Sequence, residues 1–453
     1  MLAFKRKIEE EMNCWFEESK GGSALLIEGA RRVGKTTICE EFGRKHFGHF
    51  LIVDFSSVPE DVLSLFDSLN NLEEFFQKLF FFLNVKPLPK GSLIVFDEIQ
   101  HCPKARQRLK QLVKDGRYYY IETGSLVSIR ENTASIQIPS EEYPIQMFPM
   151  DYEEFLWAVG KEEEAQMIRG LYEKRQTPDP NLHKRLLNTF FYYLSIGGMP
   201  SVVAAYLETK DIAAAERKKK EIIALYQNDL RKLDDKYGTQ TKRIFDLLPL
   251  IASRQTFTMP LTLFGIDPRT SAFSNNMDKI EESKIFGVVH ETDVIEIAHS
   301  AGIDVTRFKL YYSDVGLALC HAYTKDPNDV RPFYKKLIQG ELRTNLGYIM
   351  EGAILQMLSA SGKKLFYTSW SEEVEKPDGT TYLVYFEVDF LYGKYGKTQP
   401  VEVKTGRQRS IASATKLRTK RGDFVRKPIL ICERPFIDFE DRTEIPYYMT
   451  FCL

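Results

Sequence analysis

The residues best suited to chemistry lie between positions 29 and 37, where the sequence reads GARRVGKTT. This GxxxxGK[ST] pattern of a phosphate-binding loop lies between an apolar run at 24–28 and a helical pattern. Glycines let backbone N–H groups turn towards phosphates, and the start of the helix adds a favourable dipole. We expect Lys35 to contact the β- and γ-phosphates of ATP and Thr36 to bind Mg²⁺. The residues expected to hold the nucleotide are Gly29, Arg32, Val33, Gly34, Lys35, Thr36 and Thr37.

An acidic pair predicts the second half of this site. Asp97 and Glu98 follow the apolar run 92–96, so we expect Asp97 to contact Mg²⁺ through water and Glu98 to act as general base. The alternative is that the pair only caps the next helix. Ser125 follows the strand pattern 118–122 and is expected beside the γ-phosphate, although serine in a loop is also a common turn residue.

A second set of charged residues lies near the carboxyl end of the sequence. Asp389 lies in a strand pattern, and Glu402 and Lys404 end the next one, which is the PD-(D/E)xK nuclease arrangement with Val388 in place of the proline. Alternation along a strand puts Glu402 and Lys404 on one face. Asp389 and Glu402 are then expected to share Mg²⁺ or Mn²⁺, while Lys404 steadies a water or the scissile phosphate. The alternative is a solvated rim of charged strand ends.

A basic stretch follows this cluster. Residues 404–427 contain nine Lys or Arg side chains and the single acid Asp423, a composition suited to phosphate contacts.

The elements that must position these residues fall into four predicted domains. Strand patterns at 24–28, 50–55, 93–96, 118–122 and 145–148 alternate with helical stretches and predict a parallel α/β sheet in domain 1–151. Residues 152–238 are helical in pattern. Residues 239–309 predict a winged helix-turn-helix, with helices at 260–266 and 271–283 and wing strands at 287–290 and 294–298. Domain 310–453 predicts strands at 364–367, 382–391, 399–404 and 428–432.

Composition narrows the classes of function. The 453 residues carry a net charge of −1, so any nucleic-acid surface must be a local patch. The six cysteines form no CxxC pair, which argues against a zinc knuckle or a disulfide framework. No apolar run approaches the length of a membrane span, so we expect a cytoplasmic protein without membrane association.

These motifs together resemble a known group of proteins. GARRVGKTT, IVFDEIQ and ETGS, in this order, are similar to the AAA-like P-loop ATPases of bacteria and archaea. The closer resemblance is to an uncharacterised bacterial subgroup with a C-terminal domain of unknown function. The stretches that carry this resemblance are FPMDYEEFLW, GGMPSVV, YYSDVGLA, GYIMEGAILQML, EVDFL and PVEVKTG.

The resemblance implies an AAA-like ATPase domain, a helical lid at 152–238, a winged helix and a restriction-endonuclease-like α/β domain. It also implies a further acidic metal ligand at Glu351, in the helical stretch 347–358, and we expect Glu351 to lie with Asp389, Glu402 and Lys404 in one pocket. Many relatives carry a Gly-Arg pair where this chain reads IQIPSEEY at 136–143. An arginine finger would therefore come from elsewhere, and the candidates are Arg106, Arg108 and Arg130.

Two functions remain open from the sequence. The first is an ATP-dependent enzyme that acts on DNA, with ATP hydrolysis coupled to the nuclease-like domain. The second is a nucleotide-controlled switch or interaction protein whose nuclease-like domain is catalytically inert. The expected cofactors are ATP and Mg²⁺, with a second Mg²⁺ or Mn²⁺ in the C-terminal domain. The expected partners are DNA and either a second copy of the chain or another protein.

Overall fold

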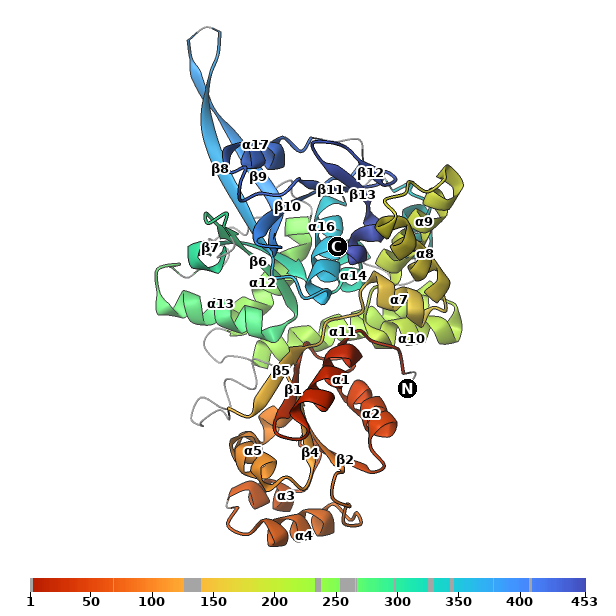
Figure 1. The fold of residues 1–453 in the computed structure, drawn as a ribbon, viewed down its shortest axis with the longest axis vertical. Coiled ribbons are helices and arrows are strands. Elements are labelled where there is room, and N and C mark those ends of the chain that lie inside the picture. Colours follow the sequence, from red (N-terminus) through yellow and green to blue (C-terminus); the bar gives the residue numbers. More distant parts are fainter. Residues whose placement is uncertain are drawn as a thin grey trace. The chain divides into compact units, whose positions relative to one another are not determined.

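The chain folds into two compact units in the computed structural model (Figure 1). Unit 1 comprises Met1–Phe148 with Glu282–Lys284, and unit 2 comprises Pro149–Glu281 with Ile285–Leu453. The structure describes all residues except 1–2, 68, 126–139, 233–237, 253–264, 266, 297–298, 325–329, 343–345, 378 and 407–409, and the side chains of 238–240.

Unit 1 is built on a five-stranded, all-parallel sheet with the order β2-β3-β4-β1-β5. Its strands are β1 (Ala24–Glu28), β2 (Phe50–Asp54), β3 (Leu93–Asp97), β4 (Tyr119–Gly124) and β5 (Glu142–Gln146). Its helices are α1 (Ile8–Ser19), α2 (Lys35–His46), α3 (Glu60–Ser64), α4 (Leu72–Phe82) and α5 (Pro103–Asp115). The predicted parallel sheet is confirmed, although β5 lies earlier in the chain than the predicted strand at 145–148.

Apolar side chains explain why this sheet forms. All of β3 is buried, and its Phe96 packs in one core with phenylalanines of α4. Phe66, which lies between α3 and α4, contacts both Phe75 and Phe96 edge to face. A strand buried on both faces must be apolar throughout, and LIVFD meets that requirement until its last residue. The acidic end of β3 is therefore fixed at the carboxyl edge of the sheet.

The first half of unit 2 is helical. Its helices are α7 (Tyr152–Ala158), α8 (Glu162–Glu173), α9 (Pro180–Ile196), α10 (Pro200–Thr209), α11 (Ile212–Lys232), α12 (Gly238–Ala252) and α13 (Ser271–Ser283). Among the described residues no single helix is long and apolar enough to cross a membrane, and α9 with α10 meets that test only as a pair bent by 110°.

The second half of unit 2 contains an eight-stranded mixed sheet with the order β12-β13-β11-β10-β9-β8-β6-β7. Its strands are β6 (Phe286–Thr292), β7 (Ile303–Tyr312), β8 (Phe366–Glu375), β9 (Thr381–Lys394), β10 (Lys397–Val403), β11 (Ile429–Cys432), β12 (Ile437–Asp438) and β13 (Thr443–Pro446). The helices of this half are α14 (Val315–Tyr323), α15 (Val330–Ile338), α16 (Gly347–Ala360) and α17 (Ala412–Lys420). Helix α16 packs against β6, β7 and β10, and β8 with β9 extends beyond the sheet as a long two-stranded arm (Figure 1).

The region predicted as a wing belongs to this sheet. The first predicted wing strand lies in β6, but residues 294–296 form no strand, and 297–298 lie outside the described residues. The antiparallel partner of β6 is β7, and the other edge of β6 pairs in parallel with β8, so the hairpin continues the sheet. The predicted domain boundary between residues 309 and 310 falls inside β7. Helix α13 matches the predicted recognition helix, while the helix predicted at 260–266 lies outside the described residues except Gly265.

Four of the motifs that carry the family resemblance meet in one buried hydrogen-bond network in unit 2. The Met150 N–H donates to the carbonyl of Gly198 (2.8 Å), and the Gly198 N–H donates to the Asp314 carboxylate (2.6 Å). The Gln356 side chain donates to the Met150 carbonyl (2.8 Å) and accepts from the Val315 N–H (3.0 Å). We call these residues the Asp314 network. It joins the segment before α7 to the starts of α10 and α14 and to α16, so these motifs fix how those elements meet.

Two backbone segments approach closely at Gly198 in this network, so adding one methyl group there should strongly affect stability. A Cβ at Gly198 would lie 2.0 Å from the Met150 carbonyl oxygen, so Gly198→Ala should lower the free energy of unfolding by about 1–3 kcal/mol or more, as overpacking does. Gly170 in α8 has nothing within 4 Å of such a Cβ, and Gly170→Ala should instead raise stability by about 0.5–1 kcal/mol. Urea unfolding of both variants measures this difference, and equal stabilities would contradict it.

Candidate functional site

The phosphate-binding loop of unit 1 has the backbone geometry that its sequence predicts. It connects β1 to α2, and two of its residues, Arg32 (φ 68°) and Gly34 (φ 102°), have left-handed backbone conformations. A Cβ at Gly29 would lie 2.4 Å from the Met147 carbonyl oxygen, so only glycine fits where the loop leaves the strand. Successive turns of this kind direct backbone N–H groups into a concave anion site.

Lys35 is buried in this loop and is held by neutral acceptors. Lys35 is the first residue of α2. Its ammonium donates to the carbonyls of Gly29 and Ala30, each at 3.0 Å. Burial lowers the pKa of Lys35, and the negative charges of Glu98 and Asp97 partly oppose this effect. Because neutral carbonyls hold the ammonium, its charge remains available to a phosphate.

Asp97 connects the loop to the strands beside it. The Thr36 hydroxyl donates to one carboxylate oxygen of Asp97 (2.7 Å), and the Thr123 hydroxyl donates to the other. Burial raises the pKa of Asp97 above its ordinary value, and both hydroxyl contacts oppose the rise. A buried carboxylate beside a hydroxyl at a phosphate loop is the oxygen donor set that Mg²⁺ takes, so the residues fit a magnesium nucleotide. Thr123 was not predicted, although it stands in the ETGS motif.

The remaining predicted residues of this site surround the same sheet edge. Glu98 has a left-handed backbone conformation (φ 52°) directly after β3, and its carboxylate accepts a hydrogen bond from the Gln100 side chain. Ser125 follows the end of β4. Thr37 is the third residue of α2.

Arg6 is a second residue that sequence reasoning missed. It lies before α1, is 6% exposed, and donates to the Val33 carbonyl (3.0 Å) and the Phe148 carbonyl (2.6 Å). It therefore joins the phosphate loop to the segment after β5. A lone arginine in a charged N-terminal helix pattern gives no signal of such a role.

The two candidate arginine fingers that the structure describes, Arg106 and Arg108, have partners within unit 1. Arg106 is 5% exposed and forms a bidentate ion pair with Glu142, at 2.8 and 2.7 Å. Arg108 donates to the carbonyls of Phe66 (3.3 Å) and Asp67 (2.8 Å). Arg130 lies outside the described residues.

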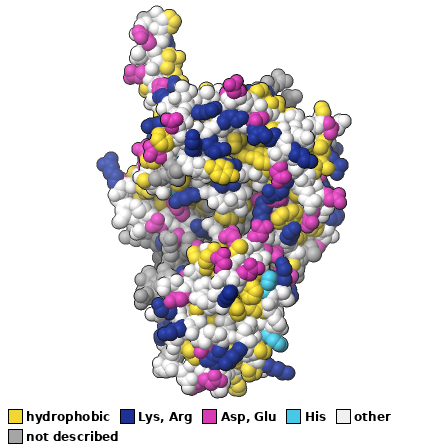
Figure 2. Space-filling model, viewed as in Figure 1, with side chains coloured by type: hydrophobic (Ala, Val, Ile, Leu, Met, Phe, Trp, Pro, Cys, Tyr) yellow, Lys and Arg dark blue, Asp and Glu magenta, His cyan; other side chains and the backbone are white. Residues whose placement is uncertain are grey.

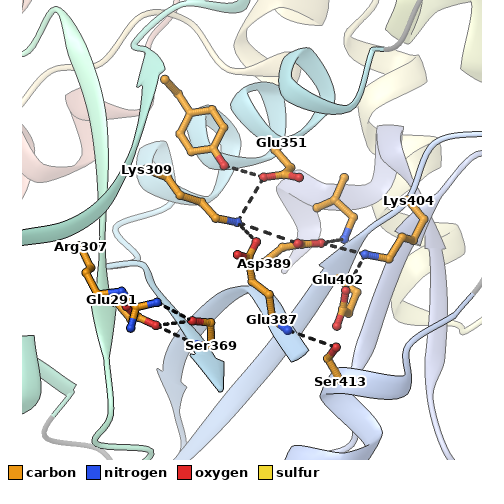
Figure 3. A network of polar contacts seen from close by, with 12 residues as sticks. Glu291, Arg307, Lys309, Glu351, Ser369, Glu387, Asp389, Glu402, Lys404 and Ser413 are labelled. Carbon is orange, nitrogen blue, oxygen red and sulfur yellow. Dashed lines mark hydrogen bonds and ion pairs between the residues drawn. The ribbon is translucent and has the colours of Figure 1, made fainter. Parts of the chain in front are cut away.

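The charged residues of the C-terminal cluster come together in unit 2 (Figure 3). Glu351 is on α16, Asp389 on β9 and Glu402 on β10, and Lys404 follows β10 directly. The Lys404 ammonium is 2.7 Å from a Glu402 oxygen and 3.3 Å from an Asp389 oxygen. Asp389 also accepts from the Val403 N–H (2.7 Å), which joins the two neighbouring strands.

Lys309, which sequence reasoning missed, occupies the middle of this cluster (Figure 3). It projects from β7, is fully buried, and its ammonium lies 2.6 Å from Glu387, 3.6 Å from Glu351 and 4.0 Å from Asp389. The Tyr311 hydroxyl also donates to Glu351. The available signal was a lysine inside the apolar run of β7, where an aliphatic residue would be expected.

The cluster contains more carboxylates than ammonium groups. Burial raises the pKa of Glu351 to about 7, and burial together with the charge of Asp389 raises the pKa of Glu402 to about 8. Burial by itself would lower the pKa of Lys309 and Lys404. The surrounding carboxylates have the larger effect and raise the pKa of both lysines. One Glu402 oxygen, Oε1, is buried without a hydrogen-bond partner. Excess negative charge therefore remains for a proton or a cation to neutralise.

This arrangement differs from a ready metal site. In the described part of the chain no group of three or more His, Cys, Asp or Glu side chains has the geometry to hold a metal ion. The physical reason lies in the lysines, because the Lys309 ammonium is within 4.0 Å of both Glu351 and Asp389, and the Lys404 ammonium contacts both Asp389 and Glu402. The metal roles of Glu351, Asp389 and Glu402 therefore stay predictions.

The described residues of the predicted basic stretch have different surroundings. Lys416 and Lys420 of α17 both pair with Glu372 of β8, whereas Arg418, Arg426 and Lys427 line a separate cavity. Arg407 and Arg409 lie outside the described residues.

Comparisons with known proteins agree with the fold of unit 1. Residues 22–156 match the family described as an AAA domain, and residues 187–328 match a domain of unknown function (DUF8612). No curated protein matches the chain. With the five-stranded parallel sheet, the first match shows an AAA-type P-loop fold for residues 22–156, and the mixed sheet belongs to a second domain that follows it.

Solved structures are similar only at a distance. Cdc6p from Pyrobaculum aerophilum is 14% identical with a TM-score of 0.27, over 74% of this chain and 95% of that chain. A chain of Drosophila ORC bound to DNA is 11% identical with a TM-score of 0.26, over 67% of this chain and 91% of that chain. TM-scores this low support no conclusion about function.

The raised pKa of Glu402 predicts how stability depends on pH. A carboxyl group whose pKa is higher in the folded than in the unfolded chain favours folding at low pH. For Glu402 this contribution is fully present below pH 4.5, its ordinary pKa, and is lost as the pH rises towards about 8. Glu402→Gln cannot ionise, so between pH 5 and pH 9 the variant should gain stability relative to wild type, on the order of a few kcal/mol.

Denaturant unfolding at pH 5, 7 and 9 measures this relative gain. Glu375→Gln, which changes an exposed glutamate of β8, is the control and should follow wild type at every pH. Parallel curves for wild type and Glu402→Gln would show that Glu402 is ionised throughout.

Proposed function

We propose that this protein hydrolyses ATP at the phosphate loop of unit 1 and acts on DNA, with ATP turnover coupled to a nuclease-like site at the charged cluster of unit 2. The observation that carries the ATPase part is the hydrogen-bonded connection from Thr36 to Asp97 to Thr123 beside the buried Lys35. The match of residues 22–156 to an AAA domain supports the same activity.

The site residues of unit 1 divide the work of this proposed reaction. Gly29, Arg32, Val33 and Gly34 shape the loop, while Lys35 and Thr37 bind phosphate oxygens. Thr36 and Asp97 hold Mg²⁺, which when bound neutralises charge on the phosphate oxygens. Glu98 orients the attacking water and accepts its proton. Ser125 lies beside the terminal phosphate.

The proposed reaction in unit 2 is cleavage of a phosphodiester. Asp389 and Glu402 are the proposed ligands of Mg²⁺ or Mn²⁺, with Glu351 as a further acidic ligand, and Lys404 steadies the attacking water or the scissile phosphate. The convergence of these side chains from α16, β9 and β10 supports the proposal, as does the buried Glu402 oxygen without a partner. A metal ion would have to displace the two ammonium groups from between the carboxylates.

One observation favours the second candidate function. Lys309 and Lys404 already balance part of the carboxylate charge, as expected of a cluster that stabilises the fold without a metal. In that case the protein is a nucleotide-controlled switch, and its nuclease-like domain binds DNA or a protein partner without cleaving it. Both candidates include action in the cytoplasm and assembly with a second copy or another protein.

The ATPase proposal predicts different effects for two variants. Lys35→Ala should weaken binding of a fluorescent ATP analogue about tenfold or more, because a charged hydrogen-bond donor is lost. Glu98→Gln should keep that affinity but slow phosphate release by about two to four orders of magnitude. Lys45→Ala, which removes an exposed lysine from the same helix, should change neither. Phosphate release by Glu98→Gln at the wild-type rate would assign the water to another residue.

The nuclease proposal predicts that Asp389 is essential for cleavage alone. Asp389→Ala, and the more conservative Asp389→Asn, should abolish Mn²⁺-dependent cleavage of plasmid DNA because a metal ligand is lost, and both should keep the ATPase rate. Asp423→Asn changes an exposed acid near the cluster in sequence and should cleave normally. Cleavage that survives both Asp389 variants would place the activity elsewhere, and no cleavage by wild type, with or without ATP, would favour the switch.

A further inference from the structure

A cavity of about 580 Å³ in unit 2 gathers positive charge away from the carboxylate cluster. It lies at the turn between β9 and β10. The end of α17 and Arg175, the second residue after α8, also line it. Its volume is in the range of small-molecule sites. The basic residues that line it are Arg175, Lys394, Lys397, Arg418, Arg426 and Lys427.

Most of this charge lacks a carboxylate partner. Asp438 pairs with both Arg175 and Lys427. The other four basic residues form no ion pair with a side-chain carboxylate in the described part of the chain, and Glu173 is the acidic residue of the lining. Two of these four have neutral acceptors, the carbonyl of Asp441 for Arg418 (3.4 Å) and the side-chain amide of Gln399 for Arg426.

The basic groups also repel one another. Burial and the nearby Arg426 both lower the pKa of Lys394, whose ammonium donates to a backbone oxygen of Leu453, the last residue of the sequence (3.2 Å). The Arg426 guanidinium has the Gln399 amide oxygen as its acceptor (3.3 Å). Gathering more cations than counter-charges at a cavity costs free energy that a bound anion would recover. Lys and Arg side chains accordingly gather over the part of unit 2 that carries α17 and β12 (Figure 2).

An aromatic residue stands beside the cavity in an unfavourable backbone conformation. Tyr395 and Gly396 form the two-residue turn between β9 and β10, with φ values of 49° and 73°. Asn, Asp or Gly usually takes the Tyr395 position of such a turn. The Tyr395 side chain is 84% exposed, and its ring centre is 5.5 Å from the Arg426 guanidinium. An exposed aromatic ring held next to free cations offers a stacking surface for a base.

We propose that this cavity is a second phosphate site, which binds the phosphate monoester of a nucleotide while Tyr395 stacks on its base. The nucleotide is either free or the 5′ end of a nucleic-acid strand, because both carry the same chemical group. The site is separate from the carboxylate cluster, since Lys394 and Lys397 lie five residues along their strands from Asp389 and Glu402, roughly 16 Å at about 3.3 Å per residue. It does not depend on the proposed nuclease activity.

The test uses the full chain with Lys35→Ala and Asp389→Asn, so that neither other proposed phosphate site contributes. Fluorescence anisotropy follows a single-stranded oligonucleotide with a 5′-phosphate and a 3′ dye, and AMP and a 5′-hydroxyl oligonucleotide are the competitors. The double variant Arg418→Gln, Arg426→Gln should weaken binding about tenfold or more, because two charged donors are lost. The matched double variant Lys416→Gln, Lys420→Gln removes equal charge from lysines that pair with Glu372, and it should keep the affinity within about twofold.

Tyr395→Asn keeps the test informative if the arginine variant unfolds. Asparagine suits the left-handed turn, so this variant should be at least as stable as its parent, yet it should bind the oligonucleotide more weakly. Displacement by AMP would identify a free nucleotide as the ligand, and binding of the phosphorylated oligonucleotide alone would identify a strand end. Equal losses of affinity in the two double variants would overturn the proposal. So would a 5′-hydroxyl oligonucleotide that binds as tightly as the phosphorylated one while AMP does not bind.

Discussion

The buried carboxylate of Asp314 is the constraint on which unit 2 depends. It accepts from the N–H groups of Gly198 and Leu317, and burial raises its pKa, so removal of either donor would leave a costly charge inside the protein. Through Gly198 and Met150 the same network reaches Gln356 on α16. A side chain in place of Gly198 would collide with backbone, so these segments hold one arrangement.

This network also positions the charged cluster. Gln356 and Glu351 belong to the same helix, so fixing α16 against Met150 fixes where Glu351 meets Tyr311 and Lys309. Lys309 in turn holds carboxylates from α16 and β9 around one buried ammonium. Buried charges of this kind are strongly destabilising when one partner is missing, so the cluster specifies how α16 packs on the sheet whether or not it binds a metal.

In unit 1 most of the fold and site follows from local sequence. The phosphate loop, the buried strand that ends in Asp97 and the strand that ends in the ETGS motif each carry their information within a few residues. Parallel strands then bring their carboxyl ends to one edge, which explains why Thr36, Asp97 and Thr123 meet. The contacts of Arg6 with Val33 and Phe148 were beyond prediction, because Phe148 lies 142 positions from Arg6 in the chain.

The sequence by itself determined the phosphate loop, the acidic strand end beside it and the charged residues Asp389, Glu402 and Lys404 in and directly after β9 and β10, because each depends on residue type and short-range spacing. Only the tertiary structure decided that β6 and β7 continue the large sheet, that Lys309 lies among the carboxylates, and that Arg418 and Arg426 face a cavity while Lys416 and Lys420 pair with Glu372. Strand pairing and the neutralisation of buried charge both depend on partners far away in the chain. The alternation of residues within one strand carries no record of those partners.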